Sequence, residues 1–433
     1  MNKSILKLAI PNIISNITIP LLGMVDMILM GHLESPVYLG GVGLGAVIFS
    51  VVYSSFGFLR MGTTGFTAQA LGSGNKTEII YPLYRSLTIG LAIAMLLLLF
   101  QIPLEKLSFK LLNGSEETKS MARKYFYIRI WAAPATLSLF AIKGWFIGMQ
   151  NTKTPMFIAI LINILNIIFN ILFVVWLQMD VDGVALGTVL AQYGGLLAGL
   201  LILNRSYKSF FLKIEKKILF EIDKMKRFFK VNSDLFIRSL VLILTLSFFT
   251  SQSGKLGDNI LAINTMIIQY FYVYSYFIDG IAYAGEALVG KFYGAGDEKQ
   301  LKSAINHLLI WGTVLCLPFV FLYGFSSPLL FRFVTNNANL LLLAHDYRLW
   351  MALIPLTTFA AFIWDGIFTG AMASKALRNT ILIATFVFFL PAWYFLTPIY
   401  GNHGLWIAFQ LFMLSRGITM TLLAKKAVYT IKT

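Results

Sequence analysis

Twelve long apolar segments set the main constraint on how this 433-residue chain folds. Each approaches or exceeds the roughly 20 residues that a helix needs to cross the hydrocarbon core of a bilayer. Only 12% of the residues are charged, against about 25% in soluble domains. The sequence therefore predicts an all-α polytopic membrane protein, and we place the spans at residues 7–31, 38–71, 82–104, 121–148, 156–178, 182–203, 230–252, 259–290, 303–323, 341–372, 379–399 and 402–424.

The chain also repeats itself at an offset of 221 or 222 residues. "GSGNKTEI" at 72–79 resembles "GAGDEKQL" at 294–301, and "FIGM" and "GVALGTVLAQ" likewise return as "FTGA" and "GLWIAFQLFM". Each half then holds six spans, so the halves are parallel repeats about an axis along the membrane normal, a common transporter architecture. We expect two pseudo-symmetric six-helix bundles: an N-lobe at 1–203, a basic cytoplasmic linker at 204–229 and a C-lobe at 230–433.

The net charge of +16 comes largely from Lys and Arg residues in the loops between the predicted spans. Cations gather on one side of the predicted membrane, with a dense cluster in the linker, and this bias marks the cytoplasmic side. The 104–121 loop, which carries Lys106, Lys110 and Lys119, is the main exception. We expect both termini in the cytoplasm and the chain in the cell membrane. No motif favours nucleic acid as a partner.

Polar side chains inside the N-lobe spans are the strongest indication of function, because a charge at membrane depth is costly and usually functional. Asp26 lies in the first span, and the fifth and sixth spans contribute the other candidates, which are Asn163, Asn166, Asn170 and Thr188. If these spans pack together, their oxygens form one pocket for Na⁺, or Asp26 binds and releases a proton. The alternative is that the amides and the hydroxyl only join helices by hydrogen bonds.

The C-lobe spans carry a second set, Asp279, Glu286 and Asp365. At the repeat offset, Asp365 corresponds to Lys143 of the N-lobe, and Asp279 corresponds to a position near Arg60. One hypothesis is that these opposite charges face each other across the lobes and close a cytoplasmic gate. The alternative, at least as well supported, is a set of ion pairs inside each lobe.

Catalytic and nucleotide-binding patterns are missing from the sequence. "GSGNK" lacks the spacing of a phosphate-binding loop, the four histidines are scattered, and no nucleophile lies beside a base. A single cysteine, Cys316, excludes an intrachain disulfide. We therefore expect no enzyme activity and no cofactor apart from H⁺ or Na⁺ as the coupling ion.

Several motifs resemble the multidrug and toxic compound extrusion (MATE) family, especially its DinF-like branch: "IPNIISNITIPLLGMVDMILMGHL", "GWFIGMQNTKTP", "IDGIAYAGEALVGKFYGAGD" and "WDGIFTGA". The resemblance spans nearly the whole chain. It implies two six-helix bundles that export organic, often cationic, compounds in exchange for H⁺ or Na⁺. It also matches Asp26, Asn166 and Thr188 to the cation site of the N-lobe. Many relatives have an aspartate where this chain has Asn170, which leaves one acid and favours H⁺.

Two other functions stay open. A lipid-linked saccharide flippase of the same superfamily would need a cavity lined by many cations. The predicted spans contain few cations that could face inward. A membrane enzyme or passive channel would not depend on an ion gradient. As partners we expect a small organic substrate and membrane lipid, with the chain as a monomer.

Overall fold

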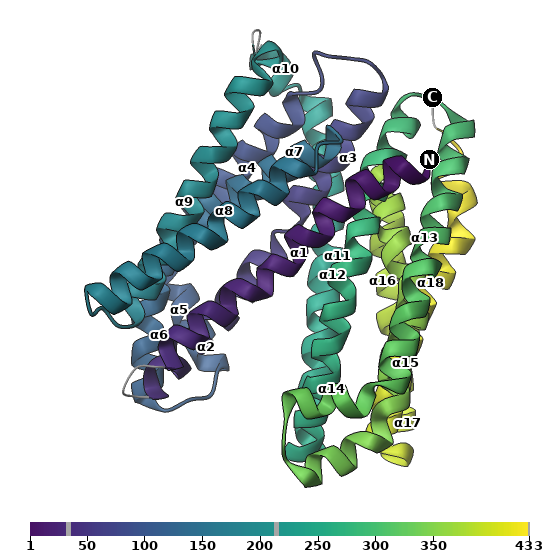
Figure 1. The fold of residues 1–433 in the computed structure, drawn as a ribbon. Coiled ribbons are helices and arrows are strands. Elements are labelled where there is room, and N and C mark those ends of the chain that lie inside the picture. The colour runs from purple at the N-terminus through teal and green to yellow at the C-terminus, as the bar shows by residue number, and fades with distance from the viewer. Residues whose placement is uncertain (32–35, 212–215, 432–433) are drawn as a thin grey trace. The chain divides into compact units, whose positions relative to one another are not determined.

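The computed structural model describes residues 1–31, 36–211 and 216–431, without the side chains of residues 19, 21–31, 36, 216 and 217. Within these ranges the chain forms helices joined by short turns, and no strand occurs (Figure 1). The elements of the first half are α1 (Asn2–Gly31), α2 (Pro36–Ser55), α3 (Phe58–Gly72), α4 (Tyr81–Leu99), α5 (Gln101–Leu111), α6 (Glu116–Arg129), η1 (Ile130–Ala132), α7 (Ala133–Gly148), α8 (Lys153–Asn170), η2 (Ile171–Trp176) and α9 (Val181–Ser206).

The remaining elements follow in the same manner. Two short helices lie between the halves, η3 (Lys208–Phe210) and α10 (Lys216–Leu219). The second half consists of α11 (Ile222–Lys255), α12 (Asp258–Gly294), α13 (Glu298–Phe325), α14 (Ser327–Val334), α15 (Ala338–Gly370), α16 (Ser374–Ile383), η4 (Ala384–Phe389), α17 (Leu390–Tyr400) and α18 (Asn402–Ala427).

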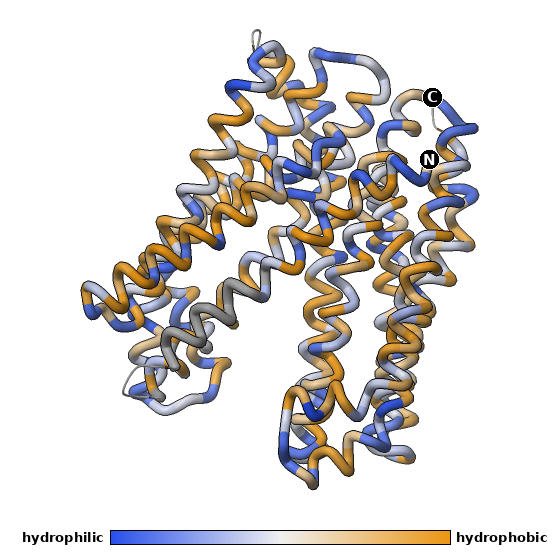
Figure 2. The backbone as a smooth tube through the Cα atoms, viewed as in Figure 1, coloured by the Kyte–Doolittle hydropathy of each residue, from blue (hydrophilic) through white to orange (hydrophobic). Residues whose placement is uncertain are grey.

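Eleven helices in the described part of the chain are long and apolar enough to cross a membrane. Each coincides with a predicted span, and several consist of two or more labelled segments, such as α2 with α3 and α6 with α7. The predicted first span is the 30-residue helix α1. Figure 2 shows hydrophobic residues along the middle of the helices and hydrophilic residues at their ends and in the turns.

The backbone repeats at the same offset as the sequence. Three pairs of residues with positive φ lie 222 or 223 positions apart: Gly74 with Gly296, Gln150 with Met372, and Gln178 with Gly401. A hydrogen bond from a side-chain oxygen to a backbone amide three residues later repeats as well. The side-chain oxygen of Asn75 accepts a hydrogen bond from the Glu78 amide at 3.2 Å, and that of Asp297, 222 positions later, accepts one from the Gln300 amide at 3.0 Å. The turn between two spans is therefore built twice from equivalent residues.

Both halves also contain a short helix that the prediction missed. We expected 104–121 to be a loop, which was wrong for its first part, because α4 ends at Leu99 and α5 continues to Leu111. The corresponding element of the second half is α14. Both expose large apolar side chains, Leu111 at 74% and Phe333 at 91%. An amphipathic helix can lie in the membrane interface with its apolar side chains towards lipid and its lysines towards water. This position explains why α5 carries both lysines and exposed apolar side chains.

Contacts divide the chain into two compact units. One unit comprises Met1–Ile13, Ala68–Gly74 and Arg227–Thr433, and the other comprises Ile14–Thr67 and Asn75–Lys226. The helix α1 thus contributes its first residues to one unit and the rest to the other. The lobe boundaries expected from the sequence, 1–203, 204–229 and 230–433, stay a prediction.

In the first of these units, the ends of α3 and α12 cross at two equivalent glycines. A Cβ atom added to Gly72 would clash with the carbonyl oxygen of Lys291, and one added to Gly294 would clash with that of Gln69. Each glycine of the pair is the repeat equivalent of the other, and so are Gln69 and Lys291. Small residues let membrane helices approach closely, and this crossing depends on two of them.

We predict that Gly294→Ala lowers the stability of the protein by about 1–3 kcal/mol, because the added methyl group forces two backbones apart. The measurement is the midpoint of thermal unfolding in detergent. Gly43→Ala in α2 is the matched control, since a Cβ atom there has no neighbour within 4 Å. Equal midpoints for the two variants would show that the crossing tolerates separation.

Candidate functional site

Three of the five predicted N-lobe residues meet in a buried polar cluster between α8 and α9. Asn166 and Asn170 lie one turn apart on α8 and have no exposed surface, and Thr188 on α9 is 2% exposed. The amide nitrogen of Asn166 donates to Thr188 Oγ1 at 3.1 Å, and that of Asn170 donates to Asn166 Oδ1 at 3.2 Å. We call Asn166, Asn170 and Thr188 the amide–hydroxyl cluster.

Local structure explains why these groups meet. A spacing of four residues places two side chains on one helical face, and Asn166 and Asn170 have that spacing. Gly187 precedes Thr188 on α9, and a Cβ atom at Gly187 would clash with Asn170 Oδ1. The hydroxyl of Thr188 also donates to the carbonyl of Val184 at 2.9 Å, which fixes the rotamer that receives the Asn166 amide.

The helix α1 lies beside α8. Asn163, one turn before Asn166, donates its side-chain amide to the carbonyl of Thr18 at 2.9 Å. Figure 1 shows the ribbons of α1 and α8 running in similar directions. The backbone of Asp26 belongs to α1, but its side chain lies outside the described residues. Its predicted contact with the amide–hydroxyl cluster is therefore neither seen nor contradicted.

The oxygens of Asn166 and Thr188 are of the kind that hard cations accept as ligands. Each accepts one hydrogen bond from a neighbouring amide, and each has two lone pairs, so these bonds do not by themselves exclude a cation. Within the described residues, no three His, Cys, Asp or Glu side chains come together as a metal site.

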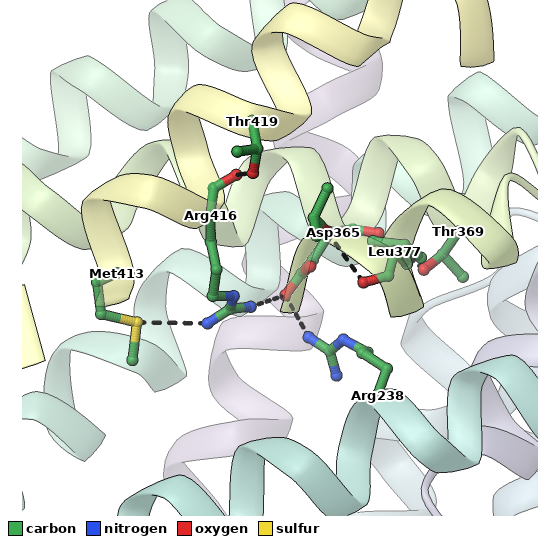
Figure 3. Close-up of polar contacts among 8 residues, drawn as sticks. Arg238, Asp365, Thr369, Leu377, Met413, Arg416 and Thr419 are labelled. Atoms are coloured by element: carbon green, nitrogen blue, oxygen red, sulfur yellow. Dashed lines mark hydrogen bonds and ion pairs between the residues drawn. The ribbon is translucent and has the colours of Figure 1, made fainter. Parts of the chain in front are cut away.

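A second buried cluster holds the C-lobe acid Asp365. Its Oδ2 atom accepts a hydrogen bond from Arg416 Nη2 of α18 at 2.6 Å and another from Arg238 Nη2 of α11 (Figure 3). The side chains of Arg416, Asp365 and Arg238 are 3%, 10% and 12% exposed. We call these three residues the arginine–aspartate cluster. The sequence analysis did not predict that Arg238 and Arg416 would join Asp365.

Further contacts complete the arginine–aspartate cluster. Arg416 donates its other terminal nitrogen to the sulfur of Met413 at 3.3 Å, and its charge also interacts with that of Asp279. A charge in hydrocarbon needs such partners to offset its lost hydration. Asp365 thus has the ion pairs inside its own half that we gave as the alternative to an inter-lobe gate.

The other predicted gate residues are placed as follows. Glu286 on α12 and Arg60 on α3 are buried, and Asp279 and Lys143 are half-buried. Gly144, next to Lys143 on α7, lies against the backbone carbonyl of Arg60, where a Cβ atom would clash. The two N-lobe cations therefore occupy adjacent positions on packed helices. A gate role for these four residues stays a prediction.

Comparisons with known proteins agree with this architecture. A sequence model of the MatE family matches residues 11–172 and 235–395, one stretch in each half. The DNA damage-inducible protein F of Escherichia coli (strain K12) is 35% identical over 419 residues, which cover 97% of this chain and 91% of that protein. A probable multidrug resistance protein NorM of Thermotoga maritima is 23% identical and covers 89% of this chain and 83% of its own.

The fold also matches solved structures. One, described as the outward-facing conformation of a multidrug resistance MATE family transporter of the MOP superfamily, superposes with a TM-score of 0.88. It is 19% identical and covers 100% of this chain and 96% of its own. The predicted fold class, twelve membrane helices in two repeated halves, is confirmed.

We predict that Asp365→Asn destabilises the protein by about 3–5 kcal/mol, because it leaves two buried arginines without their anion. The control is Glu298→Gln, which removes an exposed pair with Lys302 at 3.2 Å and is expected to cost under about 1 kcal/mol. The measurement is the midpoint of thermal unfolding in detergent. An Asp365→Asn variant that unfolds together with the wild type would refute a stabilising role for the cluster.

Proposed function

Because this chain belongs to the MATE family of transporters, we propose that it is a secondary active antiporter that exports small organic compounds. It is a multi-pass membrane transporter and not an enzyme. The proposed substrates are cationic or amphipathic, and the proposed counter-ion is H⁺, with Na⁺ as the second candidate. Export proceeds by alternating access, in which the substrate and the ion use the same site in turn.

The buried amide–hydroxyl cluster is the observation that carries this proposal. Three neutral polar side chains meet where hydrocarbon surrounds the helices, and such groups are usually functional in membrane spans. Asp26 follows Thr18 by eight residues, or about 12 Å along a helix, and Asn170 follows Asn163 by seven, or about 10.5 Å. If α1 and α8 run in the same direction, as the first and fifth spans of a bundle do, Asp26 lies at the level of Asn170.

Proton exchange at Asp26 fits this environment better than Na⁺ binding. Because position 170 holds an asparagine and not an acid, the proposed pocket has Asp26 as its one carboxylate to offset a cation. A carboxyl group near apolar surroundings holds its proton more strongly, and access to water on the outer side would supply that proton.

We further propose the membrane topology. The excess of Lys and Arg in alternate loops and in the segment around α10 places both termini in the cytoplasm, in the cell membrane of a monomeric transporter. The lobes at 1–203 and 230–433 would then carry six spans each. Arg60, Lys143, Asp279 and Glu286 remain gate candidates on the cytoplasmic side of this arrangement.

The second candidate function is a lipid-linked saccharide flippase. Arginines inside the spans favour it, because a flippase must accommodate a diphosphate. Two of these, Arg238 and Arg416, are already bound to Asp365, so the arginine–aspartate cluster offers little free charge to a diphosphate. We therefore rank export of organic cations first.

Inverted membrane vesicles that contain the full chain test this function. We expect an inside-acid pH gradient to drive accumulation of a fluorescent organic cation, and a protonophore to abolish it. An imposed Na⁺ gradient at equal pH should drive less than about a tenth of that uptake. Uptake that survives collapse of both gradients would contradict antiport. Uptake driven by the Na⁺ gradient alone would identify Na⁺, and not H⁺, as the counter-ion.

Thr188→Val makes the same assay specific for the amide–hydroxyl cluster. It removes the hydroxyl that accepts from Asn166, and we expect gradient-driven uptake to fall about ten-fold or more. Thr358→Val is the matched control, because Thr358 is equally buried and its hydroxyl bonds only the carbonyl one turn earlier, at 2.6 Å. Equal activity of both variants would exclude the cluster from coupling.

A further inference from the structure

A cavity of about 600 Å³ lies at the end of the second half where α11 begins and α18 ends. Its walls come from the first turns of α11, the last residues of α12 and α18, and the turn that leads from α15 into α16. All of these segments belong to one compact unit. The cavity is separate from both buried polar clusters described above.

The charge of this cavity is strongly positive. Four cationic side chains line it, and they are Arg227, Lys230, Lys375 and Lys426. All four are exposed. In the described part of the chain, the three lysines make no ion pair and no side-chain hydrogen bond. Lys230, Lys375 and Lys426 therefore give the cavity three positive charges without an ion-pair partner among the described residues.

The acid that lines the cavity is already bound. Asp234 is 4% exposed, its Oδ1 accepts from Arg378 Nη1 at 2.7 Å, and its Oδ2 accepts from Ser374 Oγ at 2.9 Å. Both carboxylate oxygens thus hold the start of α16 in place. The acid organises the wall of the cavity and leaves the lysines free to bind another anion.

The N-terminus of α16 adds to the positive field. Ser374 and Lys375 are its first residues, both line the cavity, and no side chain caps the helix. The first turn of a helix presents unpaired amide groups and the positive end of the helix dipole. Met372 adopts a left-handed conformation, with φ of 57°, just before this turn, and it directs the chain so that α16 begins at the cavity.

The surroundings of the cavity are apolar. Val231 and Leu423 line it between the cations. On the same helices, Phe229 beside Lys230 is 50% exposed and Leu422 beside Leu423 is 75% exposed. Lysines next to exposed apolar side chains at the end of membrane spans are placed for the boundary between lipid headgroups and acyl chains. An occupant of this cavity therefore meets cations and hydrocarbon together.

We propose that this cavity binds the phosphate headgroup of an anionic phospholipid. The four cations and the start of α16 would hold the phosphate, and the exposed apolar side chains of α11 and α18 would contact its acyl chains. Basic pockets between membrane helices recognise anionic headgroups in this way. On the topology proposed above, the lipid comes from the cytoplasmic leaflet.

The repeat argues that this site is particular to the second half. At the offset of 222, Lys375 corresponds to Lys153, but Lys230 and Arg227 correspond to Leu8 and Ile5. A general excess of cytoplasmic cations would place charge at both copies. Here one copy carries cations at Arg227 and Lys230, and the other has apolar residues at the two equivalent positions.

The test uses the purified full chain in neutral detergent and three probes: dioctanoyl phosphatidylglycerol, dioctanoyl phosphatidylcholine and inorganic phosphate. We expect phosphatidylglycerol alone to raise the midpoint of thermal unfolding in a saturable manner. The triple variant Lys230→Gln, Lys375→Gln, Lys426→Gln should raise the half-saturating concentration about 100-fold, or about five-fold for each lysine removed. All three lysines are exposed, so their substitution leaves the packed core unchanged. Lys375→Glu alone provides the same test with one substitution.

The control is a second triple variant with the same charge change away from the cavity, Lys153→Gln, Lys255→Gln, Lys299→Gln. It should respond to phosphatidylglycerol as the wild type does. Three outcomes would overturn the proposal: an equal response to phosphatidylcholine, an equal response to inorganic phosphate, or an equal loss in the control. The second outcome would indicate a site for free phosphate rather than for lipid.

Discussion

A polar side chain in hydrocarbon has to find its partners within the protein, and this constraint determines where the functional groups of this transporter lie. Water does not compensate a buried amide or charge at membrane depth, so each such group is bonded to another helix or changes its state. Two clusters satisfy the constraint in different ways. The amide–hydroxyl cluster is neutral and linked by single hydrogen bonds, and the arginine–aspartate cluster is charged and held by ion pairs.

That difference separates the roles of the two halves. Neutral groups joined by bonds of 3.1 and 3.2 Å can exchange one partner for another without leaving a buried charge unpaired. Releasing Asp365 from two arginines would leave uncompensated charges and is far more costly. This difference is the reason for proposing ion coupling in the first half and a structural role for the arginine–aspartate cluster in the second.

The internal repeat preserves the backbone and varies the polar groups that it carries. The paired left-handed residues recur 222 or 223 positions apart, the side-chain hydrogen bonds of Asn75 and Asp297 recur 222 apart, and Gly72 and Gly294 fill equivalent places where two helix ends cross. At the same offset, Lys143 is replaced by Asp365, and apolar Leu8 by Lys230. Small residues at close contacts cannot change without separating helices, whereas residues that line a cavity or a cluster can take a new charge.

Local hydrophobic periodicity was sufficient to predict the spans and to place Asn166 and Asn170 on one helical face. The contact between Asn166 and Thr188 was predicted only on the condition that their two spans pack together, and the structure shows that contact. The sequence was insufficient for α5 and α14, which are short and amphipathic and resemble loops in composition. It was also insufficient for the partners of Asp365. Arg238 and Arg416 lie 127 and 51 residues away in the chain, and only the packing of three helices selects them.

The proposed antiport requires Asp26 to release a proton when substrate binds. The most direct measurement is calorimetry of substrate binding to the purified chain in buffers of different ionisation enthalpy, which counts protons released. We expect about one proton per substrate for the wild type and for the control Asp180→Asn, and none for Asp26→Asn. A proton count that Asp26→Asn leaves unchanged, or a wild type that releases none, would contradict the account.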